Sequence, residues 1–85
     1  MKITDTQPTP NPNAMKIIID APVADGTKSY FNAGMAKDDP LATKLFAIEG
    51  VSGVMLLGTM VTITKQRTAD WAPVLAGVRK VFEAA

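Results

Sequence analysis

The chain has 85 residues, 47% of them hydrophobic, and a formal net charge of +1. This length predicts a single domain spanning residues 1–85. Its scattered charges argue against binding to nucleic acid, which requires clustered lysine and arginine. The sequence contains neither cysteine nor histidine. This excludes disulfides, Ser–His or Cys–His catalysis, and metal sites built from those side chains.

The first residues, Met1–Asp5, include an acid and no apolar run, so they do not match a signal peptide. No apolar stretch of membrane-spanning length occurs, and we expect no membrane partner. Lys2–Gln7 alternates weakly and predicts a short edge strand. The absence of cysteine is compatible with a reducing compartment, and we expect a cytoplasmic protein.

The segment that follows predicts a stiff turn. Three prolines restrict its φ angles and push the preceding residues toward extended geometry: Pro8, Pro10 and Pro12. Asn11 and Asn13 can hydrogen-bond nearby backbone groups, which would help the turn to aim the next strand. Alternatively, a pre-organised turn could present Asn11, Asn13 and Lys16 to a binding partner.

Ala14–Asp20 alternates in hydropathy and predicts a strand. Thr27–Asn32 predicts a second strand, which we expect to pair antiparallel with the first. Gly34–Asp39 predicts a loop. A helix of about ten residues should then begin at Pro40, with Asp38 or Asp39 as its N-cap and Gly50 as its C-terminal stop.

A hairpin is predicted from two apolar segments that flank Gly58-Thr59, a dipeptide suited to a type II′ turn. The resulting register pairs Leu57 with Met60, Leu56 with Val61, Met55 with Thr62, and Val54 with Ile63. A final helix should begin near Asp70, because apolar residues then recur at helical spacing. These elements predict an α+β fold: a mostly antiparallel sheet of four or five strands with two helices packed on one face.

The hairpin register places Met55, Leu57 and Met60 on the sheet face away from the helices, where polar residues are normally found. Large apolar side chains there indicate a surface for docking or self-association, and methionine suits adaptable contacts. Alternatively, the first strand or the loop near Val23 or Met35 covers them.

The sequence offers little for metal binding or catalysis. Two close acidic pairs occur, Asp38-Asp39 and Asp20 with Asp25, and helix capping or solvation explains both. The segment 50–53 lacks the lysine and glycine pattern of a phosphate-binding loop. We therefore expect no catalytic residue, no metal site, no cofactor and no enzymatic activity.

Several motifs nevertheless resemble one family. Thr9-Pro10-Asn11-Pro12-Asn13-Ala14-Met15-Lys16 is similar to the Thr-Pro-Asn-Pro-Asn-x-Leu/Met-Lys opening of the Nfu/NifU N-terminal domain. The segment from Pro40 to Val51 resembles that domain's stretch ending in Ile/Val-Glu-Gly-Val. Met60–Lys65 resembles the strand after it, and Asp70-Trp71 resembles the start of its last helix. The similarity covers nearly the whole chain in order.

The resemblance implies a role in iron–sulfur cluster assembly. In full Nfu proteins a separate C-terminal domain with a Cys-x-x-Cys pair carries the cluster, and no residue of this sequence matches a cluster ligand. The resemblance thus implies a non-enzymatic module that contacts an iron–sulfur scaffold or client protein. The residues proposed for that contact are Asn11, Asn13, Lys16, Met55, Leu57 and Met60. Two alternatives stay open: a homo-oligomerising structural protein, and weak iron binding through carboxylates. The oligomeric state is not predicted.

Overall fold

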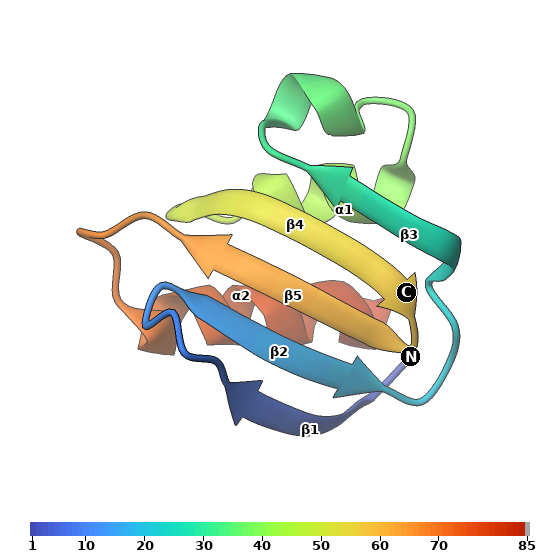
Figure 1. Ribbon diagram of the computed structural model, residues 1–85, viewed down its shortest axis with the longest axis horizontal. Helices are drawn as coiled ribbons and strands as arrows, with labels where there is room; N and C mark the ends of the chain where they lie inside the picture. Colours follow the sequence, from blue (N-terminus) through green and yellow to red (C-terminus); the bar gives the residue numbers. More distant parts are fainter. Residues whose placement is uncertain (85) are drawn as a thin grey trace.

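The computed structural model describes residues 1–84 and shows an α+β fold. Its elements are β1 (Ile3–Pro8), β2 (Ala14–Ile19), β3 (Ala24–Tyr30), the 3-10 helix η1 (Ala33–Ala36), α1 (Pro40–Phe46), β4 (Val51–Gly58), β5 (Met60–Lys65) and α2 (Trp71–Ala84). The strands form one sheet in the order β1-β2-β5-β4-β3, and every neighbouring pair is antiparallel (Figure 1). The predicted fold class is therefore confirmed.

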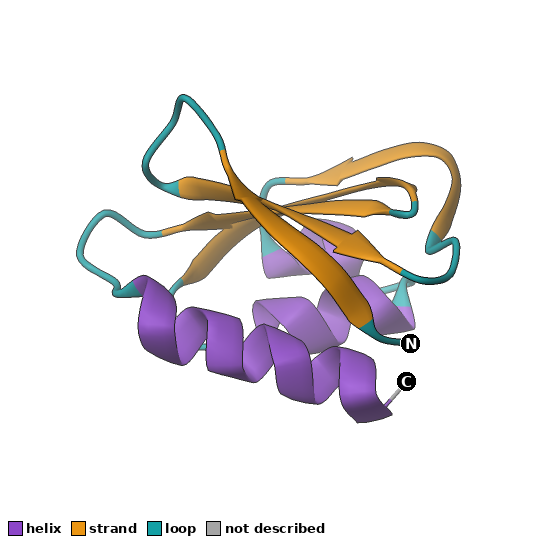
Figure 2. Ribbon diagram, turned by 90° about the horizontal axis from the view of Figure 1, so that it is seen from below, coloured by secondary structure: helices purple, strands orange, loops and turns teal. Residues whose placement is uncertain are grey.

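All the helices lie on one side of the sheet (Figure 2). The core lies between the two layers, and its fully buried large side chains come from β2, β4, β5, α1 and α2. They are Ile17, Leu45, Leu56, Val61, Ile63, Val74, Val78 and Phe82. Because side chains alternate along a strand, the residues between these strand positions face away from the helices. No helix within residues 1–84 is long and apolar enough to cross a membrane.

The β4–β5 hairpin has the predicted register, from Leu57 opposite Met60 to Val54 opposite Ile63. Gly58 has a φ of 57°, and no non-glycine residue in the described range has a positive φ. A positive φ at the first loop position alone defines a type II′ turn, as predicted. The turn fixes which hairpin side chains face the helices.

The predicted pairing of the 27–32 strand with the 14–20 strand is wrong. β2 pairs with β1 on one side and β5 on the other, so both of its edges are occupied. β3 instead pairs with β4, with Thr27 opposite Leu57 and Tyr30 opposite Val54. The connection to β3 is anchored where the Val23 amide donates to the Gly58 carbonyl at 2.8 Å.

Two predictions around the first helix are also wrong. Residues 34–39 are not all loop, because η1 forms there with the Asn32 side chain accepting the Met35 amide at 2.9 Å. α1 ends at Phe46, earlier than predicted, where the Ile48 amide tightens the chain by donating to the Leu45 carbonyl at 3.2 Å. Gly50 does not stop the helix. With a φ of 96°, it forms the turn into β4.

Candidate functional site

The proline-rich segment forms a turn that is held by its own polar groups. Asn11 Oδ1 accepts the Asn13 amide at 2.9 Å, and the Ala14 amide donates to the Asn11 carbonyl at 3.0 Å. Thr9 Oγ1 accepts the Asn11 amide at 3.2 Å and lies 3.0 Å from the Ala14 carbonyl oxygen. These contacts support the structural interpretation of the motif, because its side chains stabilise the entry into β2.

The same turn is fastened to β5 and α2. The Lys65 ammonium group donates to Asn13 Oδ1 at 3.0 Å, and the Lys65 amide donates to the Asn13 carbonyl at 2.7 Å. The Trp71 indole N–H donates to the Pro12 carbonyl at 3.0 Å, and Lys65 Nζ lies 5.7 Å from the centre of the Trp71 ring. Asn13 therefore has a structural role, as one of the two sequence interpretations held, but its contact with Lys65, 52 residues away, was not predicted.

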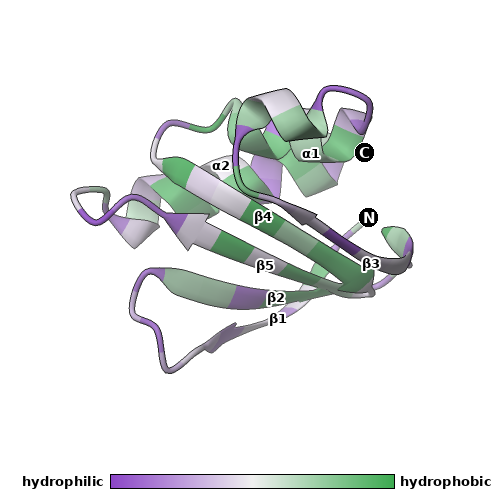
Figure 3. Ribbon diagram, turned by 45° about the horizontal axis from the view of Figure 1, so that its top comes forward, coloured by the Kyte–Doolittle hydropathy of each residue, from purple (hydrophilic) through white to green (hydrophobic). Residues whose placement is uncertain are grey.

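The sheet surface opposite the helices is termed the open face. Its side chains form two central rows, because strand pairing places them side by side. Row one is Asp5, Ile18, Met60, Leu57 and Thr27. Row two is Gln7, Lys16, Thr62, Met55 and Ser29. Figure 3 shows apolar stretches on the adjacent strands β2, β5 and β4, with a hydrophilic band on β2.

The predicted apolar residues therefore lie together. Leu57 is 42% exposed, and Met55 and Met60 are half-buried. Lys16 lies in the same row as Met55, separated from it by Thr62 of β5. The structure thus joins Lys16 to the apolar group and separates it from Asn11 and Asn13, which lie in the turn before β2.

Ile18 extends the apolar surface but was not among the predicted residues. It lies opposite Met60, and Met60 lies opposite Leu57, so the three form a continuous apolar stretch across three strands. Placing Ile18 requires the pairing of β2 with β5, which joins segments more than 40 residues apart in sequence. The alternation of Ala14–Asp20 was the only available signal, since it put Ile18 on the face opposite Ile17 and Ile19.

The acidic residues of the β3–α1 region have structural partners. Asp39 caps α1, with Oδ1 accepting the Ala42 amide at 3.1 Å. Its Oδ2 accepts the Tyr30 hydroxyl at 2.9 Å, and this bond is the main reason that the pKa of Tyr30 is raised above 10.0. Burial and the negative charges of Asp39 and Asp38 raise that pKa further. The phenol is therefore a proton donor at neutral pH.

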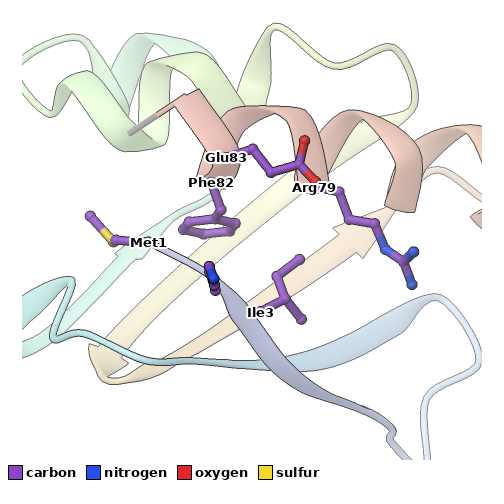
Figure 4. A pocket seen from close by; sticks show the side chains of 6 residues that line it. Met1, Ile3, Arg79, Phe82 and Glu83 are labelled. Atoms are coloured by element: carbon purple, nitrogen blue, oxygen red, sulfur yellow. The ribbon is translucent and has the colours of Figure 1, made fainter.

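A hollow of about 420 Å³ lies between β1 and the end of α2 (Figure 4). The Phe82 ring points from α2 toward β1, and Arg79 and Glu83 lie on the same helix beside it. Its lining combines cations and one carboxylate with apolar side chains, without a hydroxyl nucleophile. Within residues 1–84 no group of three acidic, histidine or cysteine side chains could hold a metal ion.

Comparison with known proteins identifies the family. The model of the family described as "Scaffold protein Nfu/NifU N terminal" matches residues 3–85. The chain belongs to the Nfu/NifU N-terminal family. The predicted resemblance is thereby confirmed.

Several named proteins contain a region that is similar to this chain. The mitochondrial NFU1 iron–sulfur cluster scaffold homolog of Drosophila erecta is 41% identical over 69 residues, covering 79% of this chain and 24% of that protein. The Homo sapiens homolog is 41% identical over 68 residues, covering 78% and 27%. The chain thus spans about a quarter of the length of these curated relatives. The crystal structure of Staphylococcus aureus SAV1430 superimposes with a TM-score of 0.82 at 27% identity, covering 96% of this chain and 99% of that one.

Proposed function

We propose that this Nfu/NifU N-terminal domain acts in iron–sulfur cluster assembly or delivery as a non-enzymatic protein-interaction module. Its partner is a cluster-carrying scaffold or a client protein, and the open face is the contact surface. The cluster stays on the partner, because the sequence contains no cysteine or histidine to ligate iron. We also propose that residues 1–85 form one domain and that this domain acts in the cytoplasm.

The open face carries this proposal. A sheet face turned toward water is normally polar, yet Ile18, Met60 and Leu57 lie side by side on this one. A protein partner would remove this apolar surface from water, which stabilises association. Lys16 lies beside these residues without an ion-pair partner in the described part of the chain and could fix the orientation of a partner carboxylate.

The named relatives supply the biological context. The Drosophila erecta and human proteins that share this domain are named as iron–sulfur cluster scaffold homologs. The turn containing Asn11 and Asn13 is assigned a supporting role, because its side-chain oxygens already accept hydrogen bonds within the chain. It holds β2 in place and thereby positions Lys16.

A titration tests the proposal. The ¹⁵N-labelled domain is mixed with a cluster-bearing Nfu C-terminal-type domain that carries the Cys-x-x-Cys pair, and amide shifts are followed by NMR. We expect shifts on β2, β5 and β4, and their loss in Leu57→Lys. The matched control Lys80→Glu lies on the exposed side of α2 and should retain the wild-type shifts. An absence of shifts at both the open face and the 9–13 turn would show that this mechanism is wrong.

A further inference from the structure

We infer that, in the free protein, the open face is covered by a second copy of this chain. The two sheets stack face to face, related by a twofold axis that runs across the strands between row one and row two. This inference goes beyond the proposed function, because it names an occupant of the open face when no cluster carrier is present.

The geometry of the rows is self-complementary. Face-to-face sheets pack about 10 Å apart with their strands nearly aligned. The twofold axis places each strand over its own counterpart and row one over row two of the second copy. Leu57 then faces the Met55 position, and Met60 faces the Thr62 position. Each apolar contact occurs twice, as an isologous interface requires.

The charges of the two rows are self-complementary in the same arrangement. These rows contain one acid, Asp5, and one base, Lys16, on the neighbouring strands β1 and β2. The twofold axis places Lys16 of one copy over Ile18 of the second copy. Asp5 of the second copy lies next to that Ile18 on the neighbouring strand, about 5 Å to the side. Gln7 Nε2 donates to Asp5 Oδ2 at 2.7 Å and steadies the carboxylate. A lysine can span this separation, so two intermolecular ion pairs form.

The size of the face predicts a weak, reversible dimer. The face is five strands wide, with strands about 4.8 Å apart, and about six residues long at about 3.3 Å per residue. It therefore measures about 24 by 20 Å. Two such faces bury about 1,000 Å² in total, near the lower limit for a specific interface. The second copy would therefore dissociate readily and leave the face available to a cluster carrier, with which it competes.

Sedimentation equilibrium over about 10 µM to 1 mM tests the inference, since this range brackets the affinities expected of a small interface. We expect a monomer–dimer equilibrium. Asp5→Lys and Lys16→Asp should each weaken the dimer at least tenfold, and the double reversal should restore the affinity to within about threefold. Restoration by the double variant cannot arise from misfolding of the single ones. Lys44→Asp, on the exposed side of α1, is the control and should leave the dimer unchanged.

A protein that remains monomeric across the whole range would overturn the inference, as would a dimer that is insensitive to both charge reversals. Neither result would affect the titration with a cluster carrier, because that experiment follows amide shifts caused by the carrier and does not require a dimer. Conversely, a dimer with the expected charge dependence would stand even if the cluster carrier produced no amide shifts. The two proposals therefore fail separately.

Discussion

The Lys65 ammonium group donates a hydrogen bond to the Asn13 side-chain oxygen at 3.0 Å, joining two residues 52 positions apart in the sequence. Lys65 is only 9% exposed, and its Nζ atom also lies over the Trp71 ring. The contact connects the proline-rich turn, the end of β5 and the start of α2. Because β2 begins at Ala14, directly after this turn, the contact also fixes the position of β2 within the open face.

Lys65→Met should lower the free energy of unfolding by about 1–2 kcal/mol. The variant keeps most of the apolar stem and removes the charged donor, so Asn13 Oδ1 loses its bond to β5. Urea unfolding measures the change. Asn13→Ala should cost a similar amount, and the double variant should cost less than the sum of the two, by about 0.5 kcal/mol or more.

The control for this pair is Lys80→Met on the exposed side of α2, which should change stability by less than about 0.5 kcal/mol. Burying a charge carries a desolvation cost, so a stabilised Lys65→Met protein would mean that this cost exceeds the benefit of the bond. Strict additivity of the Lys65 and Asn13 variants would contradict the connection itself.

Gly50→Ala should destabilise the protein by about 2–5 kcal/mol, through backbone strain together with overpacking. Gly50 has a φ of 96°, and an added Cβ would lie 2.8 Å from the Ala69 Cβ and 3.3 Å from Val74 Cγ2. Thermal unfolding measures the loss. Gly58→Ala is the matched control, because Gly58 also has a positive φ but no heavy atom within 4 Å of the added Cβ. Equal losses in the two variants would show that crowding by Ala69 is unimportant.

Local patterns predicted the parts of the fold that depend on nearby residues. The Gly58-Thr59 turn determined the hairpin register, and therefore the common face of Met55, Leu57 and Met60. The family resemblance, which rests on ordered motifs, was also recognisable from the sequence alone. These features need no knowledge of contacts between distant segments.

Long-range pairing could not be predicted in the same way. The alternation of β2 shows which of its residues share a face, but it does not show that β5 occupies the edge expected for β3. Ile18 was missed for that reason, and Lys16 was grouped with the turn rather than with Met55. Similarly, nothing near Lys65 in the sequence indicates that its amine reaches Asn13.

Tyr30→Phe should change how stability depends on pH only under alkaline conditions. The hydrogen bond to Asp39 raises the pKa of Tyr30 above 10.0 in the folded protein. The unfolded chain therefore loses this proton first as the pH rises. The contribution of Tyr30 to the free energy of unfolding is fully present below pH 10. It is lost as the pH rises through the folded-state pKa. Urea unfolding from pH 7 to pH 11 should show a smaller alkaline decline in the variant. Parallel curves for the two proteins would contradict this assignment.

The Met55→Lys/Met60→Thr double variant should fold with a loss of less than about 1 kcal/mol, while binding to a cluster carrier and self-association both weaken. Both side chains lie on the open face, so the substitutions remove apolar surface without opening a cavity between the layers. Leu56→Thr is the matched control. Leu56 lies next to Met55 on the same strand but faces the helices and is fully buried, so its replacement should cost about 2–4 kcal/mol. If the methionine variant lost stability on that scale while its binding and oligomeric state stayed unchanged, Met55 and Met60 would be core residues rather than a docking surface.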